Sequence, residues 1–180
     1  MRKIRFLILI PICVITGILL ILVSSSTSSA TEVDIFQGRI SQLIYGDVYT
    51  TFGRSVSEIQ GRIGPPMNTE TRTIPNPHVK GTTDTHIKLL YKGLNIDLLR
   101  SGATSSDLLV RVVLEDPGYV FSGDLGIGIK RMDLEAYLGP PWRLDESGDL
   151  FYGDAERNST VAFKLVENQV RGITWRYYFD

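Results

Sequence analysis

The sequence predicts an α+β fold in which two tandem helix-plus-antiparallel-meander repeats form one roughly eight-stranded sheet with helices packed on one face. Two observations carry this prediction. The segments SEIQGRIGPP, at residues 57–66, and MDLEAYLGPP, at residues 132–141, both end in an apolar residue followed by Gly-Pro-Pro. Much of the chain that follows each segment alternates apolar with polar residues, which indicates strands with one buried face. Because only the helices can cover that face, we expect them all on one side of the sheet.

Residues 1–30 have the form of an export signal or a membrane anchor. Three basic residues and no acid precede an uncharged apolar run at residues 6–23, and a Ser-rich stretch then ends at Ala30. This run is longer than the usual core of a signal peptide and just long enough to span a bilayer. We therefore expect either a signal peptide cleaved after Ala30 or an uncleaved transmembrane anchor with its N-terminus inside.

Both outcomes place the remaining chain outside the cytoplasm. It is then a periplasmic or secreted protein, or one that residues 6–23 hold on the membrane.

Without residues 1–30 the sequence carries 16 basic against 20 acidic residues, a net charge of −4. A mildly acidic domain with no basic run is a poor ligand for nucleic acid. The only cysteine, Cys13, lies within the apolar run, so the exported domain has neither a disulfide nor thiol chemistry.

Three helices are expected. The first covers residues 32–45, where apolar residues recur with helical spacing, and Gly46 closes it. The second begins at a capping box formed by Ser55 and Glu58 and ends at the first Gly-Pro-Pro. The third ends at the second Gly-Pro-Pro. In both cases the glycine can leave the helix in a left-handed conformation and the prolines prevent its continuation.

The strands follow each Gly-Pro-Pro. Residues 31–120 make up the first repeat and residues 121–180 the second, within one globular domain at 31–180. The first repeat has an extended segment, then two strands around a Lys92-Gly93 turn, then a further strand. The second has a hairpin with its turn at Ser147-Gly148, followed by two strands. The expected strand regions are 69–74, 86–100, 107–116, 142–153, 161–165 and 169–179.

The two helix segments match at six positions without a gap, at an offset of 75 residues. The matching positions are Gly53, Glu58, Ile59, Ile63, Gly64 and Pro66 in the first copy and Gly128, Asp133, Leu134, Leu138, Gly139 and Pro141 in the second. The pattern is similar to the helix motif of the SmpA/OmlA-type outer-membrane assembly lipoproteins. Two tandem copies resemble the β-lactamase-inhibitor-protein fold, and the resemblance covers roughly residues 32–180.

Both families imply a non-enzymatic protein that presents a sheet face or loops to another protein. The chain departs from both of them. The inhibitor proteins carry disulfides, which this domain cannot form. The assembly lipoproteins carry a lipobox, whereas Cys13 follows Ile12 here, and they usually have one repeat. We expect a protein-binding module of the bacterial cell envelope, including an inhibitor of an envelope or secreted enzyme. A structural or assembly factor for the outer membrane or envelope is the alternative, and a hydrolase is a more distant one.

No catalytic residue, metal ligand or small-molecule cofactor is predicted. His78, Asp84 and His86 share one loop region but lack the short fixed spacing of a zinc site. No Gly-x-Ser-x-Gly elbow is present. Several acids at residues 145–154 could form the carboxylate pair of a glycosidase. They flank an expected turn, however, so a solvated hairpin tip fits them better.

The residues that bind a partner are expected on the open face of the sheet. Alternation places Trp175, Tyr177 and Phe179 under the helices and their neighbours on the opposite side. The alternative interpretation is that this sheet face is merely solvated. The position of Trp142 fits either a core residue or an exposed anchor. The candidates are Lys88, Asp97, Arg111, Trp142, Lys164, Arg176 and Tyr178.

Overall fold

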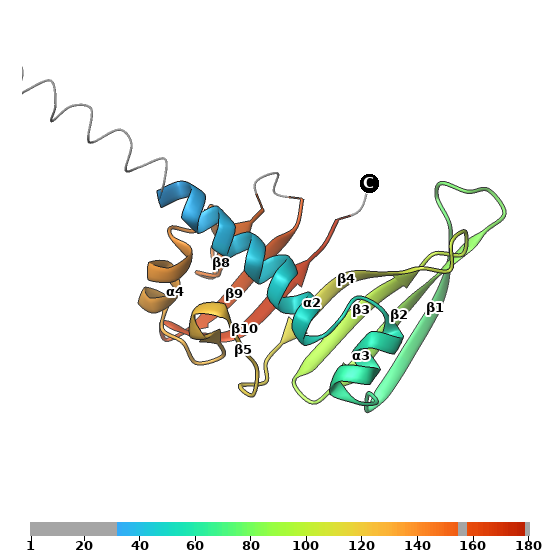
Figure 1. Ribbon diagram of the computed structural model, residues 1–180, viewed down its shortest axis with the longest axis horizontal. Helices are drawn as coiled ribbons and strands as arrows, with labels where there is room; N and C mark the ends of the chain where they lie inside the picture. Colours follow the sequence, from blue (N-terminus) through green and yellow to red (C-terminus); the bar gives the residue numbers. More distant parts are fainter. Residues whose placement is uncertain (1–31, 155–157, 179–180) are drawn as a thin grey trace, which may run out of the picture. The chain divides into compact units, whose positions relative to one another are not determined.

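A computed structural model describes residues 32–154 and 158–178 (Figure 1). The chain divides into two compact units, residues 1–35 and 36–180. Of the first unit, only residues 32–35 are described, and they are helical. The described part of the chain contains no helix long and apolar enough to cross a membrane. The expected export segment, with its apolar run, Cys13 and the cleavage point after Ala30, lies outside the described residues.

The second unit is built on one eight-stranded antiparallel sheet, which confirms the predicted α+β fold. Its strand order is β1-β2-β3-β4-β10-β9-β8-β7. A separate two-stranded sheet, β5 with β6, was not predicted. The strands are β1 (Asn68–Pro75), β2 (Thr83–Tyr91), β3 (Leu94–Arg100), β4 (Asp107–Leu114), β5 (Val120–Phe121), β6 (Leu125–Gly126), β7 (Arg143–Leu144), β8 (Leu150–Gly153), β9 (Thr160–Val166) and β10 (Gln169–Arg176).

A helix followed by a four-stranded meander occurs twice along the chain. Helix α3 (Val56–Ile63) precedes β1 to β4, and helix α4 (Arg131–Leu138) precedes β7 to β10. The two meanders meet at their last strands, because β4 pairs with β10. This is the order of elements that the predicted repeat requires, and the repeat itself stays a prediction.

Both helices end at the glycine of Gly-Pro-Pro. Gly64 has φ 85° and ψ −177°, and Gly139 has φ 77° and ψ −170°. This combination is nearly restricted to glycine, since a Cβ would be strained there. At the start of α3, the Ser55 side chain accepts a hydrogen bond from Glu58 N at 3.3 Å. The Glu58 carboxylate in turn accepts from Arg54 N at 3.0 Å, so the expected cap is present.

The first helix continues past Gly46, so the predicted stop there is wrong. The helix passes through a π-helical turn, η1 (Gln42–Asp47), and on into α2 (Val48–Thr51). Gly46 has a packing role instead, because a Cβ there would overlap the Gln42 side chain. That side chain donates to Asp47 Oδ1 at 2.9 Å. The buried Asp47 carboxylate also accepts from the backbone and hydroxyl of Ser122, at 2.9 and 2.8 Å.

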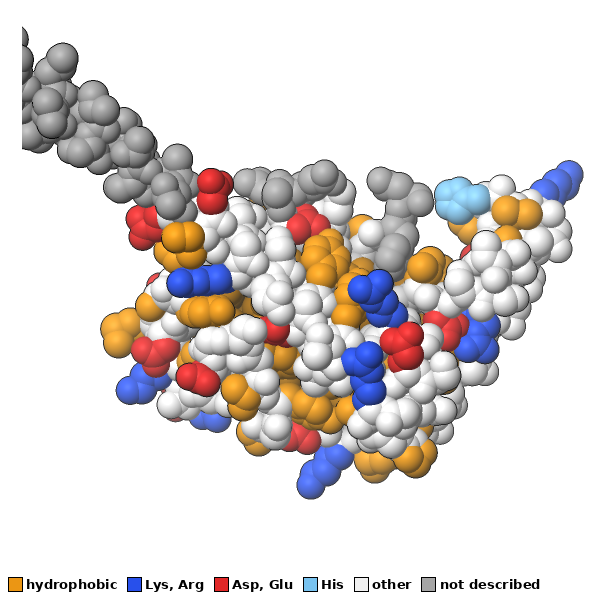
Figure 2. Space-filling model, viewed as in Figure 1, with side chains coloured by type: hydrophobic (Ala, Val, Ile, Leu, Met, Phe, Trp, Pro, Cys, Tyr) orange, Lys and Arg blue, Asp and Glu red, His pale blue; other side chains and the backbone are white. Residues whose placement is uncertain are grey.

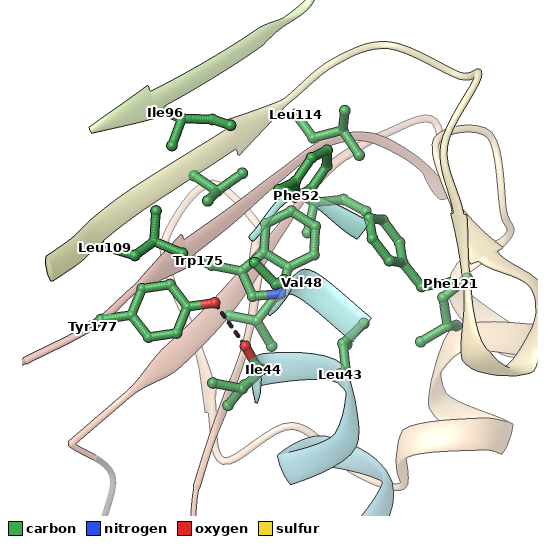
Figure 3. Close-up of a cluster of buried hydrophobic side chains, with 14 of the residues drawn as sticks. Leu43, Ile44, Val48, Phe52, Ile96, Leu109, Leu114, Phe121, Trp175 and Tyr177 are labelled. Carbon is green, nitrogen blue, oxygen red and sulfur yellow. Dashed lines mark hydrogen bonds between the residues drawn. The ribbon is translucent and has the colours of Figure 1, made fainter. Parts of the chain in front are cut away.

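The core lies between the helices and one face of the sheet (Figure 3). Ile44 and Phe52 of the first helical segment and Trp175 of β10 are fully buried. The hydroxyl of Tyr177, just after β10, donates to the Ile44 carbonyl at 2.6 Å. Phe121 sets its ring edge against Trp175, with 5.2 Å between ring centroids. Trp175 and Tyr177 therefore point under the helices as predicted, while Phe179 lies outside the described residues.

Figures 1 and 2 view the second unit from the helix-covered side. The ribbons of α2 and α3 pass in front of the strands in Figure 1. In the same view, Figure 2 shows lysine, arginine and acidic side chains scattered over this side rather than gathered in one patch.

Candidate functional site

The sheet face opposite the helices consists of the alternate residues of each strand. On β2, for example, Ile87 and Leu89 are buried under the helices, whereas Lys88 and Leu90 keep part of their surface exposed. On β9 and β10, Lys164 and Arg176 are exposed. The alternation predicted from the sequence therefore separates a buried face from an open face.

Strand register aligns four of the predicted partner-binding residues in one row across four neighbouring strands. Lys88 lies opposite Asp97, Asp97 opposite Arg111, and Arg111 opposite Arg176. Neighbouring strands are about 4.8 Å apart, so the row crosses roughly 15 Å of the sheet. We call these four residues the charged row.

Asp97 has a different role in the row from the one expected. It was predicted as a contact residue, but only 7% of its side chain is exposed, against 41% for Arg111. Arg111 Nε donates to Asp97 Oδ2 at 2.7 Å. The covered carboxylate therefore holds the guanidinium in place, while the Arg111 side chain stays partly exposed as a planar donor group. Asp97 Oδ1 is buried and has no hydrogen-bond donor among the described residues.

An open hollow of about 420 Å³ lies at the end of the charged row. It brings together three predicted residues, because Trp142, Arg176 and Tyr178 all line it. Trp142 is 41% exposed and Tyr178 62%, so both present large aromatic surfaces to solvent. Trp142 is thus an exposed residue at the rim rather than a core residue. The full lining is Trp142, Arg143, Phe151, Asn158, Thr160, Arg176 and Tyr178.

Two guanidinium groups give the open-face hollow its positive charge. Arg143 stacks on Phe151, with 3.9 Å from its Cζ to the ring centroid, and approaches Trp142 at 5.2 Å. This cation–π contact fixes a side chain that would otherwise be mobile. Among the described residues, neither Arg143 nor Arg176 has a carboxylate within 4.0 Å. As far as the described residues go, both can therefore bind an acceptor on another molecule without first breaking an ion pair.

Lys164 is the one predicted residue that joins neither feature. It lies on β9 opposite Gly172 and is exposed. It shares the open face, but it lines no part of the hollow and is not in the charged row. We expect it to contribute charge rather than a specific contact.

Four residues that line the hollow were missed from sequence. Arg143 and Phe151 are opposite each other on β7 and β8. The predicted hairpin turn could have indicated this pair, because Arg143 and Phe151 are each four residues from Ser147. Asn158 and Thr160 had no such signal: Asn158 lies in the connection between β8 and β9, and Thr160 begins β9.

Two other polar clusters have structural explanations. Asp84 is buried and accepts hydrogen bonds from Asn76 Nδ2 at 2.9 Å and from Gly102 N at 3.0 Å, so it ties two loops together. A second hollow, of about 460 Å³, lies at the start of α4, where Arg131 is already paired with Glu135 at 2.8 Å. Within residues 32–154 and 158–178, no group of three or more His, Cys, Asp or Glu residues is placed to hold a metal ion.

Comparisons with known proteins give no relative from which a role could be transferred. No protein-family model, no curated protein and no solved structure matches this chain.

Proposed function

We propose that this chain is a non-enzymatic protein-binding module that works outside the cytoplasm, and that it holds its partner with the open-face hollow and the charged row. The observation that carries the proposal is the composition of the hollow, in which exposed Trp142 and Tyr178 stand beside Arg143 and Arg176. Tryptophan, tyrosine and arginine are the residue types that most often dominate the binding energy of protein interfaces.

The state of these side chains also favours binding. Arg143 is held by its stacking on Phe151, and Arg111 by its bond to Asp97. Side chains that are fixed before the partner arrives lose less conformational entropy on association. The chemistry that fits is a protein segment with carboxylate or carbonyl acceptors for the guanidinium groups and apolar surface for the rings.

A binding role is further supported over catalysis by what lines the hollow. The described lining contains no acid, histidine or cysteine, the groups most often used in acid–base and nucleophilic chemistry. The proposed location rests on the sequence of residues 1–30, with its basic start, apolar run and Ser-rich exit.

The test compares capture by matched variants of the full-length chain. The bait is the detergent-purified protein, and the prey is a detergent extract of envelopes from the source cell. Arg176→Ala combined with Tyr178→Ala should leave the melting temperature nearly unchanged, because exposed substitutions usually alter stability by less than about 0.5 kcal/mol. Partner capture should fall about tenfold or more, because truncating a hot spot costs roughly 2 kcal/mol.

Arg171→Ala is the matched control, because Arg171 is exposed on the same strand but does not line the hollow. The proposal requires a protein that the wild type and this control both capture and that the double variant loses. Equal capture by a well-folded double variant would contradict it. A soluble enzyme as the captured partner would indicate an inhibitor, whereas a membrane assembly complex would indicate an assembly factor.

A further inference from the structure

The two edges of the large sheet differ strongly. β7 ends one edge with only two residues, whereas β1 ends the other with eight. Figure 1 shows β1 as the outermost strand on its side of the sheet, and among the described strands it pairs with β2 alone. Residues 68–73 are all exposed. A long uncovered edge presents a row of backbone donors and acceptors to any strand that can pair with it.

The register of β1 against β2 shows which backbone groups point outward. Asn76 N donates to Thr82 O at 3.0 Å, one step beyond the last paired residues of the ladder. Hydrogen-bonded and non-hydrogen-bonded pairs alternate in an antiparallel ladder, so even-numbered residues of β1 bond to β2. The odd-numbered residues Thr69, Thr71 and Thr73 then direct their N–H and C=O groups away from the sheet. In agreement, Thr69 N donates to the side chain of Asn68, at 2.9 Å, rather than to β2.

The charges on β1 are complementary to their own reversed copy. Glu70 and Arg72 flank Thr71 and lie on the same face of the sheet. If two β1 strands pair antiparallel about Thr71, Glu70 of each copy lies opposite Arg72 of the other. An axis at Glu70 or at Arg72 would instead oppose two like charges, and like charges directly opposite are destabilising.

We propose that β1 is a homodimerisation edge, at which two copies of this chain pair antiparallel about Thr71 into one continuous sheet. The hydrogen bonding and the charges select the same register. Thr71 pairs with Thr71 of the second copy, and Thr69 pairs with its Thr73, all through outward-facing backbone groups. The ion pairs fall at non-hydrogen-bonded positions, where side chains are closest. The Asn68 side chain has to release the Thr69 N–H when the second copy binds.

Two-fold pairing limits the association to two copies, and prolines bound the paired segment. Pro66 precedes β1 and Pro75 ends it, and neither can donate a backbone hydrogen bond. A two-fold interface uses the same edge of both copies, so the assembly closes and leaves only the short β7 edges free. This inference goes beyond the proposed function, because the open-face hollow lies on the other half of the sheet. The binding proposal can therefore fail while the dimer proposal holds, and the reverse.

Disulfide trapping tests the register in the full-length, detergent-purified chain, with Cys13→Ser as background. At a hydrogen-bonded pair the Cα atoms are about 5.5 Å apart, within the range that a disulfide bridges. Thr71→Cys should therefore form a covalent dimer under mild oxidation. Thr73→Cys is the matched control, because its two copies would lie about 13 Å apart along the strands. Mixing Thr69→Cys with Thr73→Cys should trap the mixed dimer.

Charge reversal tests the ion pairs by sedimentation of the same chain without introduced cysteines. Glu70→Arg should weaken dimerisation about tenfold or more, because both cross-copy pairs become repulsive. Adding Arg72→Glu to that variant should restore the dimer, although the new Arg at position 70 still lies beside Lys88 within its own chain. Equal trapping at positions 71 and 73, no trapping at 71, or no restoration by the charge swap would each overturn the proposal.

Discussion

Tyr91 and Tyr152 make the same hydrogen bond in the two halves of the sheet. Each hydroxyl donates to the carbonyl of a glycine that ends a helix, Gly64 for Tyr91 and Gly139 for Tyr152, at 3.1 Å in both cases. Each tyrosine belongs to the second strand of its meander, β2 or β8. The bond thus ties the exit of each helix to the sheet that the helix covers. It also accounts for the use of tyrosine, rather than phenylalanine, at both positions.

Tyr152→Phe should destabilise the domain more than Tyr91→Phe. Tyr152 is fully buried, so losing its hydroxyl leaves the Gly139 carbonyl without a partner where water has little access. Tyr91 is only partly buried, and water can replace its hydroxyl. We expect a loss of about 1–2 kcal/mol for Tyr152→Phe and less than about 1 kcal/mol for Tyr91→Phe, measured by urea unfolding. Equal losses would show that burial does not control the strength of these two bonds.

Gly64→Ala and Gly139→Ala should also differ. Both glycines have positive φ, so alanine is strained at either position by on the order of 1 kcal/mol. At Gly64 a Cβ would meet no atom within 4 Å, whereas at Gly139 it would come within 2.7 Å of the Phe36 ring. We therefore expect Gly139→Ala to lower the melting temperature clearly more than Gly64→Ala. The double variant Gly139→Ala with Phe36→Ala separates the clash from the strain, because it removes only the former.

The parts of the fold that could be predicted are those determined by local pattern. The hairpin turn at Ser147-Gly148 and the helix stop at Gly64 follow from turn chemistry and capping within a few residues. The wrong stop at Gly46 has a non-local cause. The glycine is covered by Gln42, and Asp47 in the same turn bonds to Ser122, 75 residues further along the chain. No local pattern around Gly46 contains that contact.

The candidate site was predictable to the same extent. Alternation alone assigns Arg176 to the open face, because each strand has only two faces. The burial of Asp97 could not be predicted, because it depends on Arg111 lying directly opposite on the neighbouring strand. That register in turn depends on an irregularity in the β3–β4 pairing just after Asp97. To predict a contact between two strands one needs their pairing register, and the residue pattern of a single strand does not specify it.

Asp107 should make the domain sensitive to acid. Its carboxylate accepts from Arg100 at 2.7 and 3.1 Å and from Val56 N, at the start of α3, at 3.0 Å. The Arg100 hydrogen bonds hold the pKa of Asp107 below its ordinary value of 3.8. The unfolded chain therefore takes up this proton first. The stabilisation is present above about pH 4 and is lost as the pH falls through the lowered pKa.

Asp107→Asn checks this directly. At neutral pH the variant should be less stable than wild type by about 1 kcal/mol, since Arg100 is partly exposed and its ion pair is partly screened. The difference should shrink as the pH is lowered below about 4, measured by urea unfolding across that range. A difference that stays constant with pH would mean that the Asp107 charge does not contribute.

Two buried tyrosines should make the domain sensitive to alkali. Burial raises the pKa of Tyr177 and of Tyr152 well above the ordinary value of 10. Both hydroxyls donate to backbone carbonyls, Tyr177 to Ile44 and Tyr152 to Gly139, and a tyrosinate cannot do so. Because the folded state binds these protons more tightly, the stabilisation is complete below about pH 10. It is lost as the pH rises through the raised folded values. The unfolded chain releases the protons first, so alkali should favour unfolding.

Stopped-flow jumps to alkaline pH can resolve this coupling. Part of the tyrosinate absorbance should develop only with the unfolding phase that exposes buried Trp175, followed in parallel by fluorescence. In the Tyr177→Phe variant this coupled absorbance should fall, because one of the two most deeply buried hydroxyls is gone. The variant should also unfold more readily at neutral pH, because the Ile44 carbonyl loses its donor. If the coupled absorbance is the same in wild type and variant, Tyr177 ionises without unfolding, and its contact with the first helix is weaker than the 2.6 Å bond indicates.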